Sequence, residues 1–326
     1  MKQLVAAFSA LAAIVLLMPA GGRLVSGQAF YKPDTPKFPQ ARTWVAQRAK
    51  LPPFKSPRTP DGVPDLQGNW NGPIGGGNDD LEEHDYIDVT TPPQESYISD
   101  PPDGKVPYTP WALAKRNEIR SGLARGWPGE TGQRLYGDPN ALCLVGMPRI
   151  SFGAQEIVQR PGQVMMLTAN TYRVIPTDGR AHMSASAKSF FGNSRGRWEG
   201  ETLVVDVTGV NGETWIDSAG NFIGPNTHMI ERWTRVEADT IDYQMTLEDP
   251  AIYTRPWTMT YPKRRQGTGP GVNPGGTTAA SAVANVNNDR YAKEYWENTC
   301  IEGNLDNVVE IKDLGFKWFN AVEPPK

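Results

Sequence analysis

Hydrophobic and polar residues alternate along much of the second half of the chain, and this alternation predicts β-strands. The clearest run is "TIDYQMTLE" at residues 240–248, where Ile, Tyr, Met and Leu occupy every second position. Successive side chains of a strand point to opposite faces of a sheet, so the pattern is typical of a strand with one buried face. Similar runs occupy residues 156–160, 163–167, 170–176, 202–208, 228–237 and 257–261.

Short turn sequences join these runs in pairs. Pro161-Gly162, Glu199-Gly200 and Ala238-Asp239 each stand between two predicted strands, which is typical of hairpins. Consecutive antiparallel strands with short connections favour an all-β fold in which a meander closes into a barrel. The 33 glycines and 29 prolines also fit a turn-rich β-protein better than a helical one.

The chain divides into five expected segments. We expect a signal peptide at residues 1–28, a long irregular extended arm at 29–63, the β-barrel at 64–265, a mobile loop at 266–289 and a C-terminal segment at 290–326. One short helix is predicted near residues 110–121. There Thr109 is a cap, Pro110 holds the first helical position and Gly122 ends the helix.

The N-terminus has the layout of a secretory signal. Lys2 is followed by an apolar run from Leu4 to Leu17, and small residues follow at Gly27 and Ala29. The alternative is a membrane anchor, but about 14 apolar residues are few for a span that needs roughly 20. The sequence therefore predicts a periplasmic or secreted protein without a stable membrane anchor.

Charge and motifs exclude several classes of function. The chain carries 33 Lys and Arg against 36 Asp and Glu, with no extended basic run, and this argues against nucleic acid as a partner. No dinucleotide-binding fingerprint and no Gly-x-Ser-x-Gly elbow is present, so we expect neither a nucleotide cofactor nor a serine hydrolase.

The chain contains two cysteines, Cys143 and Cys300. In an exported protein an even pair most often forms one disulfide, which here would join the middle of the chain to its C-terminal segment. Two buried free thiols are the alternative, and the oxidising compartment favours the disulfide.

Several motifs resemble those of a family of exported bacterial proteins without an established activity. "PDLQGNW" at residues 64–70 is similar to that family's PDLSGxW, and residues 196–217 are similar to GRWEGDTLVVDTTGFNDRTWLD. Further matches are "CLVGMPR" at 143–149, "DGRAH" at 178–182, "HMIERW" at 228–233, "EDPAIYTRPWT" at 248–258 and, loosely, residues 294–304. The chain departs from the family pattern at Ala181, at Ile301 and in an insertion at 267–288.

The Gly-x-Trp at residues 68–70 also resembles the opening of lipocalin-type barrels. Together with the meander that follows it, this short motif favours a lipocalin-like (calycin) barrel. The resemblance concerns the fold and implies no particular chemistry.

Histidine and carboxylate residues are the candidates for catalysis. Of the three histidines, His182 follows a turn and His228 begins a strand, so both are expected at a barrel mouth, whereas His84 lies in an acidic loop. Histidine is the natural acid–base group near neutral pH, and nearby carboxylates would orient it. The predicted catalytic residues are His182, His228, Asp217 and Glu231.

Asp206 is expected on the outer face of its strand. Leu203, Val205 and Val207 form the apolar face of this strand, which favours an outward side chain and a structural role for Asp206.

A metal site is not expected. His182 and His228 together with Glu231 or Asp217 would supply metal ligands, but no HExxH or HxH spacing is present.

Aromatic and basic residues are the candidates for ligand binding. Aromatic side chains that point into a barrel can line a cavity for an apolar or aromatic ligand, although each is also a normal core residue. The predicted binding residues are Trp70, Arg173, Arg180, Trp198, Trp215, Arg232, Trp233 and Tyr253.

Taken together, these features favour an exported enzyme of the lyase or isomerase type. It would use cofactor-free acid–base chemistry for elimination, hydration or isomerisation of a small apolar or aromatic molecule held in a barrel cavity. The alternative is a non-catalytic periplasmic binding protein for a hydrophobic ligand or a glycan. A structural envelope protein without a ligand is a third interpretation. Convergence of His182 and His228 with a carboxylate would favour catalysis.

Overall fold

The computed structural model describes residues 32–71, 80–87, 91–122, 136–139, 146–150, 155–168 and 171–265. The predicted signal peptide, the Cys143–Cys300 disulfide, the loop at 266–289 and the C-terminal segment at 290–326 therefore lie outside the described residues.

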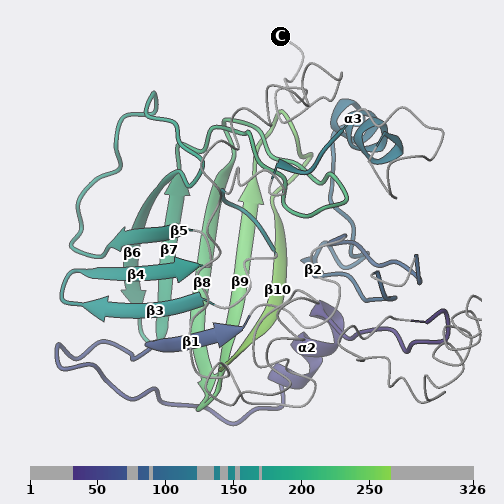
Figure 1. The fold of residues 1–326 in the computed structure, drawn as a ribbon. Helices are drawn as coiled ribbons and strands as arrows, with labels where there is room; N and C mark the ends of the chain where they lie inside the picture. The colour runs from purple at the N-terminus through teal and green to yellow at the C-terminus, as the bar shows by residue number, and fades with distance from the viewer. Residues whose placement is uncertain are drawn as a thin grey trace, which may run out of the picture.

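The described strands form one antiparallel sheet that curls into a nearly closed barrel, so the predicted all-β barrel is confirmed (Figure 1). The strands are β1 (Gly68–Asn71), β2 (Ile98–Asp100), β3 (Gln155–Arg160), β4 (Gln163–Thr168), β5 (Thr171–Pro176), β6 (Asn193–Glu199), β7 (Thr202–Thr208), β8 (His228–Glu237), β9 (Thr240–Glu248) and β10 (Trp257–Arg265). Their order is β5-β4-β3-β1-β10-β9-β8-β7-β6, with β2 paired to β10.

The first strand joins the two halves of the meander. β1 pairs on one side with β3 and on the other with β10, both antiparallel. Figure 1 shows that β1, β3, β4 and β5 run crosswise over β6 to β10, so the two halves enclose the core between them. A single up-and-down meander is thereby bent back onto its own first strand.

The barrel closes between β5 and β6, the two end strands of the sheet, and we call this boundary the seam. Among the described residues, no ladder of backbone hydrogen bonds joins the two strands. Side chains bridge the seam instead, because Nε of Arg173 on β5 donates to Oγ of Ser194 on β6 at 2.8 Å. The two strands also approach closely at Gly196, where an added Cβ would lie 2.9 Å from the Ile175 side chain. The same Cβ would lie 2.8 Å from the Thr177 side chain, so a larger residue at position 196 would require these side chains to shift.

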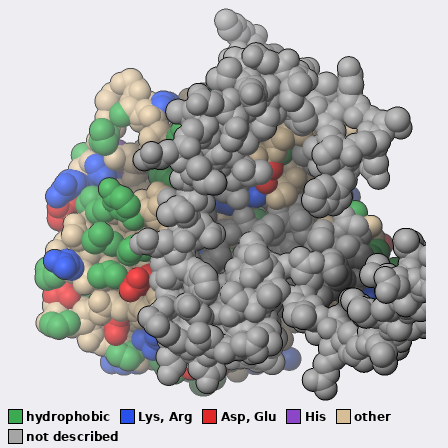
Figure 2. Space-filling view, viewed as in Figure 1, with side chains coloured by type: hydrophobic (Ala, Val, Ile, Leu, Met, Phe, Trp, Pro, Cys, Tyr) green, Lys and Arg blue, Asp and Glu red, His purple; other side chains and the backbone are tan. Residues whose placement is uncertain are grey.

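Alternation along β7 places its apolar face inside the barrel, as the sequence predicts. Leu203, Val205 and Val207 are fully buried in the core, whereas Asp206 is half-buried on the outer face. On the opposite wall β5 exposes Tyr172 and Val174. Figure 2 shows hydrophobic side chains scattered among charged ones on the described part of the visible face.

Helix α3 (Pro110–Ser121) confirms the predicted helix, and α2 (Ala41–Arg48) corrects the expectation of a purely extended arm. The cap of α2 comes from a distant residue, since Glu95 Oε2 accepts from the backbone N–H of Gln40 at 3.0 Å and of Thr43 at 3.3 Å. Trp44 then donates to Asp242 Oδ1 on β9 at 2.7 Å. No local sequence signal marks such a helix. Neither α2 nor α3 is long and apolar enough to cross a membrane.

Replacing Thr109 by alanine is expected to lower the free energy of unfolding by about 1 kcal/mol. The Thr109 side chain accepts from the Ala112 backbone N–H at 3.3 Å, and this bond satisfies one of the unpaired donors at the start of α3. Urea denaturation of the wild type, of Thr109→Ala and of Thr109→Ser measures the effect. Serine should keep most of the stability, and an alanine variant as stable as the wild type would contradict the capping role.

Candidate functional site

Two of the predicted catalytic residues meet at one carboxylate. His182 Nε2 lies 3.0 Å from Asp206 Oδ1, and His228 Nε2 lies 3.1 Å from the same oxygen. The other ring nitrogen of His228, Nδ1, lies 2.7 Å from Glu248 Oε1. We refer to His182, Asp206, His228 and Glu248 as the His–Asp–His site.

The outer face of the barrel carries this site. Residues at even positions of β7 and β8 point outward, which brings Asp206 and His228 to the same surface. Glu248 stands directly across from His228 because the two are paired in the β8–β9 ladder. Three of the four members are therefore fixed by neighbouring strands.

His182 is held by the connection between β5 and β6. Asn193 Oδ1 lies 3.0 Å from His182 Nδ1 and accepts from the Met183 backbone N–H at 3.1 Å. Arg195, which is paired with Asp206 in the β6–β7 ladder, donates to the Ala181 carbonyl at 2.8 Å. The chain on both sides of His182 is thus anchored to β6, and this aims the imidazole at Asp206.

Charge at the site favours a protonated His228. Burial lowers the pKa of His228, but the hydrogen bond to Glu248 and the charge of Asp206 outweigh it, so the pKa is raised from its ordinary value. Both ring nitrogens face carboxylate oxygens, and only the imidazolium can donate to both. The side chains of His182, Asp206 and His228 are 28%, 30% and 31% exposed, so the site is open to a ligand.

The raised pKa of His228 predicts a pH-dependent stability. A histidine whose pKa is higher in the folded state stabilises the protein below its unfolded pKa, and this contribution is lost as the pH rises through the folded pKa. We expect wild type to lose more unfolding free energy than His228→Gln between about pH 6 and pH 8. Urea titrations at several pH values measure this difference, and parallel curves for the two proteins would contradict it.

Glu231, a third predicted catalytic residue, lies inside the barrel. It is three positions from His228 on the same strand, and an odd separation puts the two on opposite faces. Glu231 forms an ion pair with Arg173 and accepts from Trp233 Nε1 at 3.3 Å and from the Tyr243 hydroxyl at 3.2 Å. This buried cluster is separate from the His–Asp–His site.

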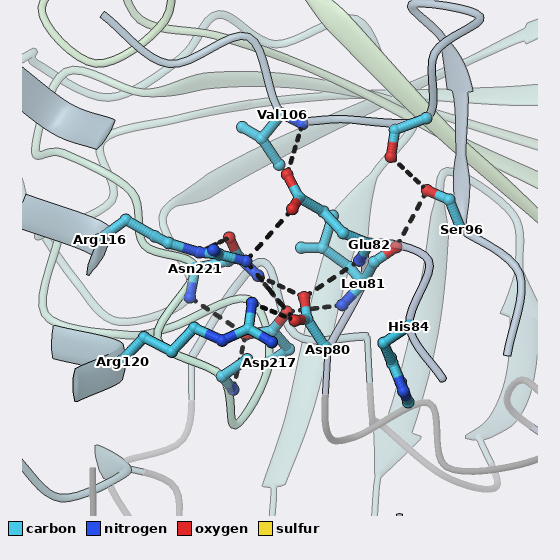
Figure 3. A network of polar contacts seen from close by, with 12 residues as sticks. Asp80, Leu81, Glu82, His84, Ser96, Val106, Arg116, Arg120, Asp217 and Asn221 are labelled. Atoms are coloured by element: carbon cyan, nitrogen blue, oxygen red, sulfur yellow. Dashed lines mark hydrogen bonds and ion pairs between the residues drawn. The ribbon is translucent and has the colours of Figure 1, made fainter. Parts of the chain in front are cut away.

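Asp217, the fourth predicted catalytic residue, is fully buried in a network of loops and α3 (Figure 3). It accepts from the backbone N–H of Leu81 at 2.8 Å and from Asn221 Nδ2 at 2.6 Å. Asn221 Nδ2 also donates to Asp80 Oδ1 at 3.1 Å, and Asp80 forms an ion pair with Arg120 of α3 at 2.7 Å. Burial and then the charge of Asp80 raise the pKa of Asp217. Through Asn221 and Asp80, these contacts connect Asp217 to α3.

The predicted binding residues do not line a single site. Trp70, Arg173 and Trp233 are buried in the barrel with Glu231, and Trp198 is partly buried against the core. Trp215 and Tyr253 are buried around Phe222. Trp215 forms a β-bridge with Phe222, and the Tyr253 hydroxyl donates to the backbone carbonyl of Phe222. The remaining two, Arg180 and Arg232, form ion pairs with Asp178 and Glu199 at the surface.

Asp206 and Glu248 are the site residues that the sequence prediction did not include. Asp206 was expected on the outer face and is found there, but its contact with His228 follows from the register of β7 against β8, and its contact with His182 from the connection that is anchored to β6. Glu248 is the last residue of β9, and its position opposite His228 depends on a bulge near Arg235. In the described part of the chain, no group of three potential ligands is arranged to hold a metal ion.

Comparisons of this chain with family models, with curated proteins and with solved structures found no match.

Proposed function

We propose that this protein is an enzyme that catalyses proton transfer at the His–Asp–His site. The observation that carries the proposal is that His182 and His228, from separate segments, both contact Asp206 Oδ1 while staying partly exposed. Two histidines on one carboxylate provide an acid and a base at adjacent positions, as elimination, hydration and isomerisation require. This chemistry needs no cofactor.

We assign a different role to each histidine. His228 lies between two carboxylates and acts as the acid, since these partners favour its protonated form. Glu248 is 51% exposed, so a substrate can displace it from Nδ1 and receive the proton there. His182 contacts one carboxylate, and the Thr208 hydroxyl, 3.2 Å from its Nδ1, can donate to this nitrogen and leave it as the acceptor that a base needs, so we assign His182 the role of the base. Asp206 orients both rings and compensates the positive charge that a proton brings.

The surroundings support a small apolar or aromatic substrate. Ile230, which is paired with Asp206 in the β7–β8 ladder, lies on the outer face beside the carboxylate. Met183, next to His182 in the chain, is 60% exposed. These two side chains offer apolar contacts next to the acid and the base. The proposal therefore locates the substrate on the outer face of the barrel and not in its interior.

The motifs that resemble the family of exported bacterial proteins support the same site. His182 belongs to the segment at 178–182, Asp206 to the segment at 196–217, His228 to the segment at 228–233 and Glu248 to the segment at 248–258. Four separate motifs thus each contribute one member. Membership of that family and export to the periplasm or the medium remain parts of this proposal, and the latter rests on the N-terminal apolar run.

Incubation of the purified protein with a panel of aromatic and terpenoid compounds tests the proposal. Products are followed by mass spectrometry and binding by quenching of tryptophan fluorescence. The variant is His182→Gln/His228→Gln, and His84→Gln, which changes the one remaining histidine, is the matched control. Turnover that is lost in the double variant and kept in the control, with binding intact, supports the enzyme.

Two outcomes would contradict the proposal. Equal turnover by the wild type and the double variant would place the chemistry elsewhere. Binding without turnover in the wild type would favour the alternative of a carrier for hydrophobic ligands, in which the two histidines only stabilise the outer face.

A further inference from the structure

A buried lysine in the barrel interior is not used by the proposed function. Lys263 lies on β10 and its residue is 2% exposed. Its Nζ lies over three aromatic rings, at 5.3 Å from the ring centre of Trp233, 5.4 Å from that of Tyr243 and 5.6 Å from that of Tyr261. The amine is therefore enclosed by aromatic side chains from β8, β9 and β10.

The described residues provide no carboxylate that forms an ion pair with Lys263. Glu231 is the acidic group that acts on the amine electrostatically, but its oxygens already accept from Arg173, Trp233 and Tyr243. An ammonium group without an ion-pair partner is costly to bury, whereas the faces of the three rings and the charge of Glu231 favour the ammonium. Burial outweighs the charge of Glu231 and lowers the pKa of Lys263 to about 7.

We propose that Lys263 is a covalent capture site for small hydrophobic aldehydes. A neutral amine in apolar surroundings is the form of lysine that attacks carbonyl carbon. The nitrogen adds to the carbonyl carbon to give a carbinolamine, and loss of one water molecule leaves an imine between Lys263 and the former aldehyde. No oxidant or reductant is consumed, and the aromatic rings around Nζ pack against the apolar part of the aldehyde.

The proposal places the entrance for the aldehyde at the seam between β5 and β6. Side chains such as Arg173 and Ser194 bridge it, so it can part without breaking a described backbone ladder. Arg173 contacts both Ser194 at the seam and Glu231 beside the aromatic rings. An aldehyde that enters here reaches the cluster to which Lys263 belongs.

Reductive trapping tests this proposal with benzaldehyde as the probe. The full-length protein is incubated at pH 7 with benzaldehyde and sodium cyanoborohydride, which reduces an imine to a stable benzylamine, and is then mapped by peptide mass spectrometry. Lys263 should be modified at least about tenfold faster than exposed lysines, whose ordinary pKa near 10.4 leaves little neutral amine at pH 7. Lys263→Met should lose the fast adduct, and Lys50→Met, which removes an exposed lysine, should keep it.

Peptide mass spectrometry of the trapped wild-type protein tests the capture site even if Lys263→Met fails to fold. An unmodified Lys263 beside modified surface lysines would overturn the proposal, as would equal rates at Lys263 and at exposed lysines. The variant His182→Gln/His228→Gln should form the adduct at the wild-type rate, because the two histidines lie on the other side of the barrel wall. Failure of the capture site is thereby distinguished from failure of the His–Asp–His site.

Discussion

Glu231→Leu is expected to lower the free energy of unfolding by about 3–5 kcal/mol, because it leaves Arg173 buried without its anionic partner. Glu231 is 0% exposed and Arg173 is 7% exposed, so water does not compensate the lost ion pair. The same substitution leaves the Tyr243 hydroxyl and the Trp233 indole N–H without their acceptor. Chemical denaturation followed by tryptophan fluorescence measures the loss.

The matched control removes both charges together. Arg173→Met/Glu231→Leu replaces the ion pair by apolar side chains of similar size, and such replacements of buried pairs are often neutral or stabilising. We therefore expect the double variant to be more stable than Glu231→Leu alone. A single variant as stable as the wild type would show that Glu231 does not hold the barrel interior together.

Asp206→Asn is expected to lower kcat/KM by about 10²–10⁴-fold once a substrate has been found, the range typical for the loss of general acid–base catalysis. Asparagine keeps the shape of the side chain but removes the charge that both histidines face. An amide at this position also presents a donor or a neutral acceptor to His182 and His228 in place of the shared carboxylate oxygen. Binding of the substrate should change little.

Two further variants give this measurement its control. Glu248→Gln should have a smaller effect than Asp206→Asn, because Glu248 contacts only His228. Asp34→Asn changes an exposed carboxylate in the N-terminal arm and should leave turnover unchanged. An Asp206→Asn variant with wild-type kcat/KM would exclude Asp206 from the chemistry.

The alternation of hydrophobic and polar residues predicted the strands of this fold and the face on which Asp206 lies. The three predicted hairpins are present, with turns at Pro161-Gly162 and Ala238-Asp239 as expected, whereas the turn expected at Glu199-Gly200 consists of Gly200 and Glu201 because Glu199 pairs with Thr202. The same alternation also separates His228 from Glu231, since three residues along a strand reverse the face. The sequence therefore contained the information that these two residues belong to different sites.

Contacts between distant segments could not be predicted in this way. Helix α2 takes its cap from Glu95, so its own residues carry no capping signal. The bulge near Arg235 shifts the β8–β9 ladder by one residue and brings Glu248 opposite His228, whereas the register at the turn alone would bring Asp249 there. The burial of Asp217 likewise depends on Asp80 and Asn221.

An NMR titration of the imidazole signals of His182 and His228, in wild type and in Asp206→Asn, tests the His–Asp–His site most directly. The structure predicts that His228 titrates above the ordinary histidine value of 6.5, and that its pKa falls in Asp206→Asn, where one of its two carboxylates is neutral. The chemical shifts of the His182 ring at a fixed pH should also change in this variant, since the ring faces the same oxygen. Titration of His228 at its ordinary value, unchanged by Asp206→Asn, would contradict a site in which two histidines share one carboxylate.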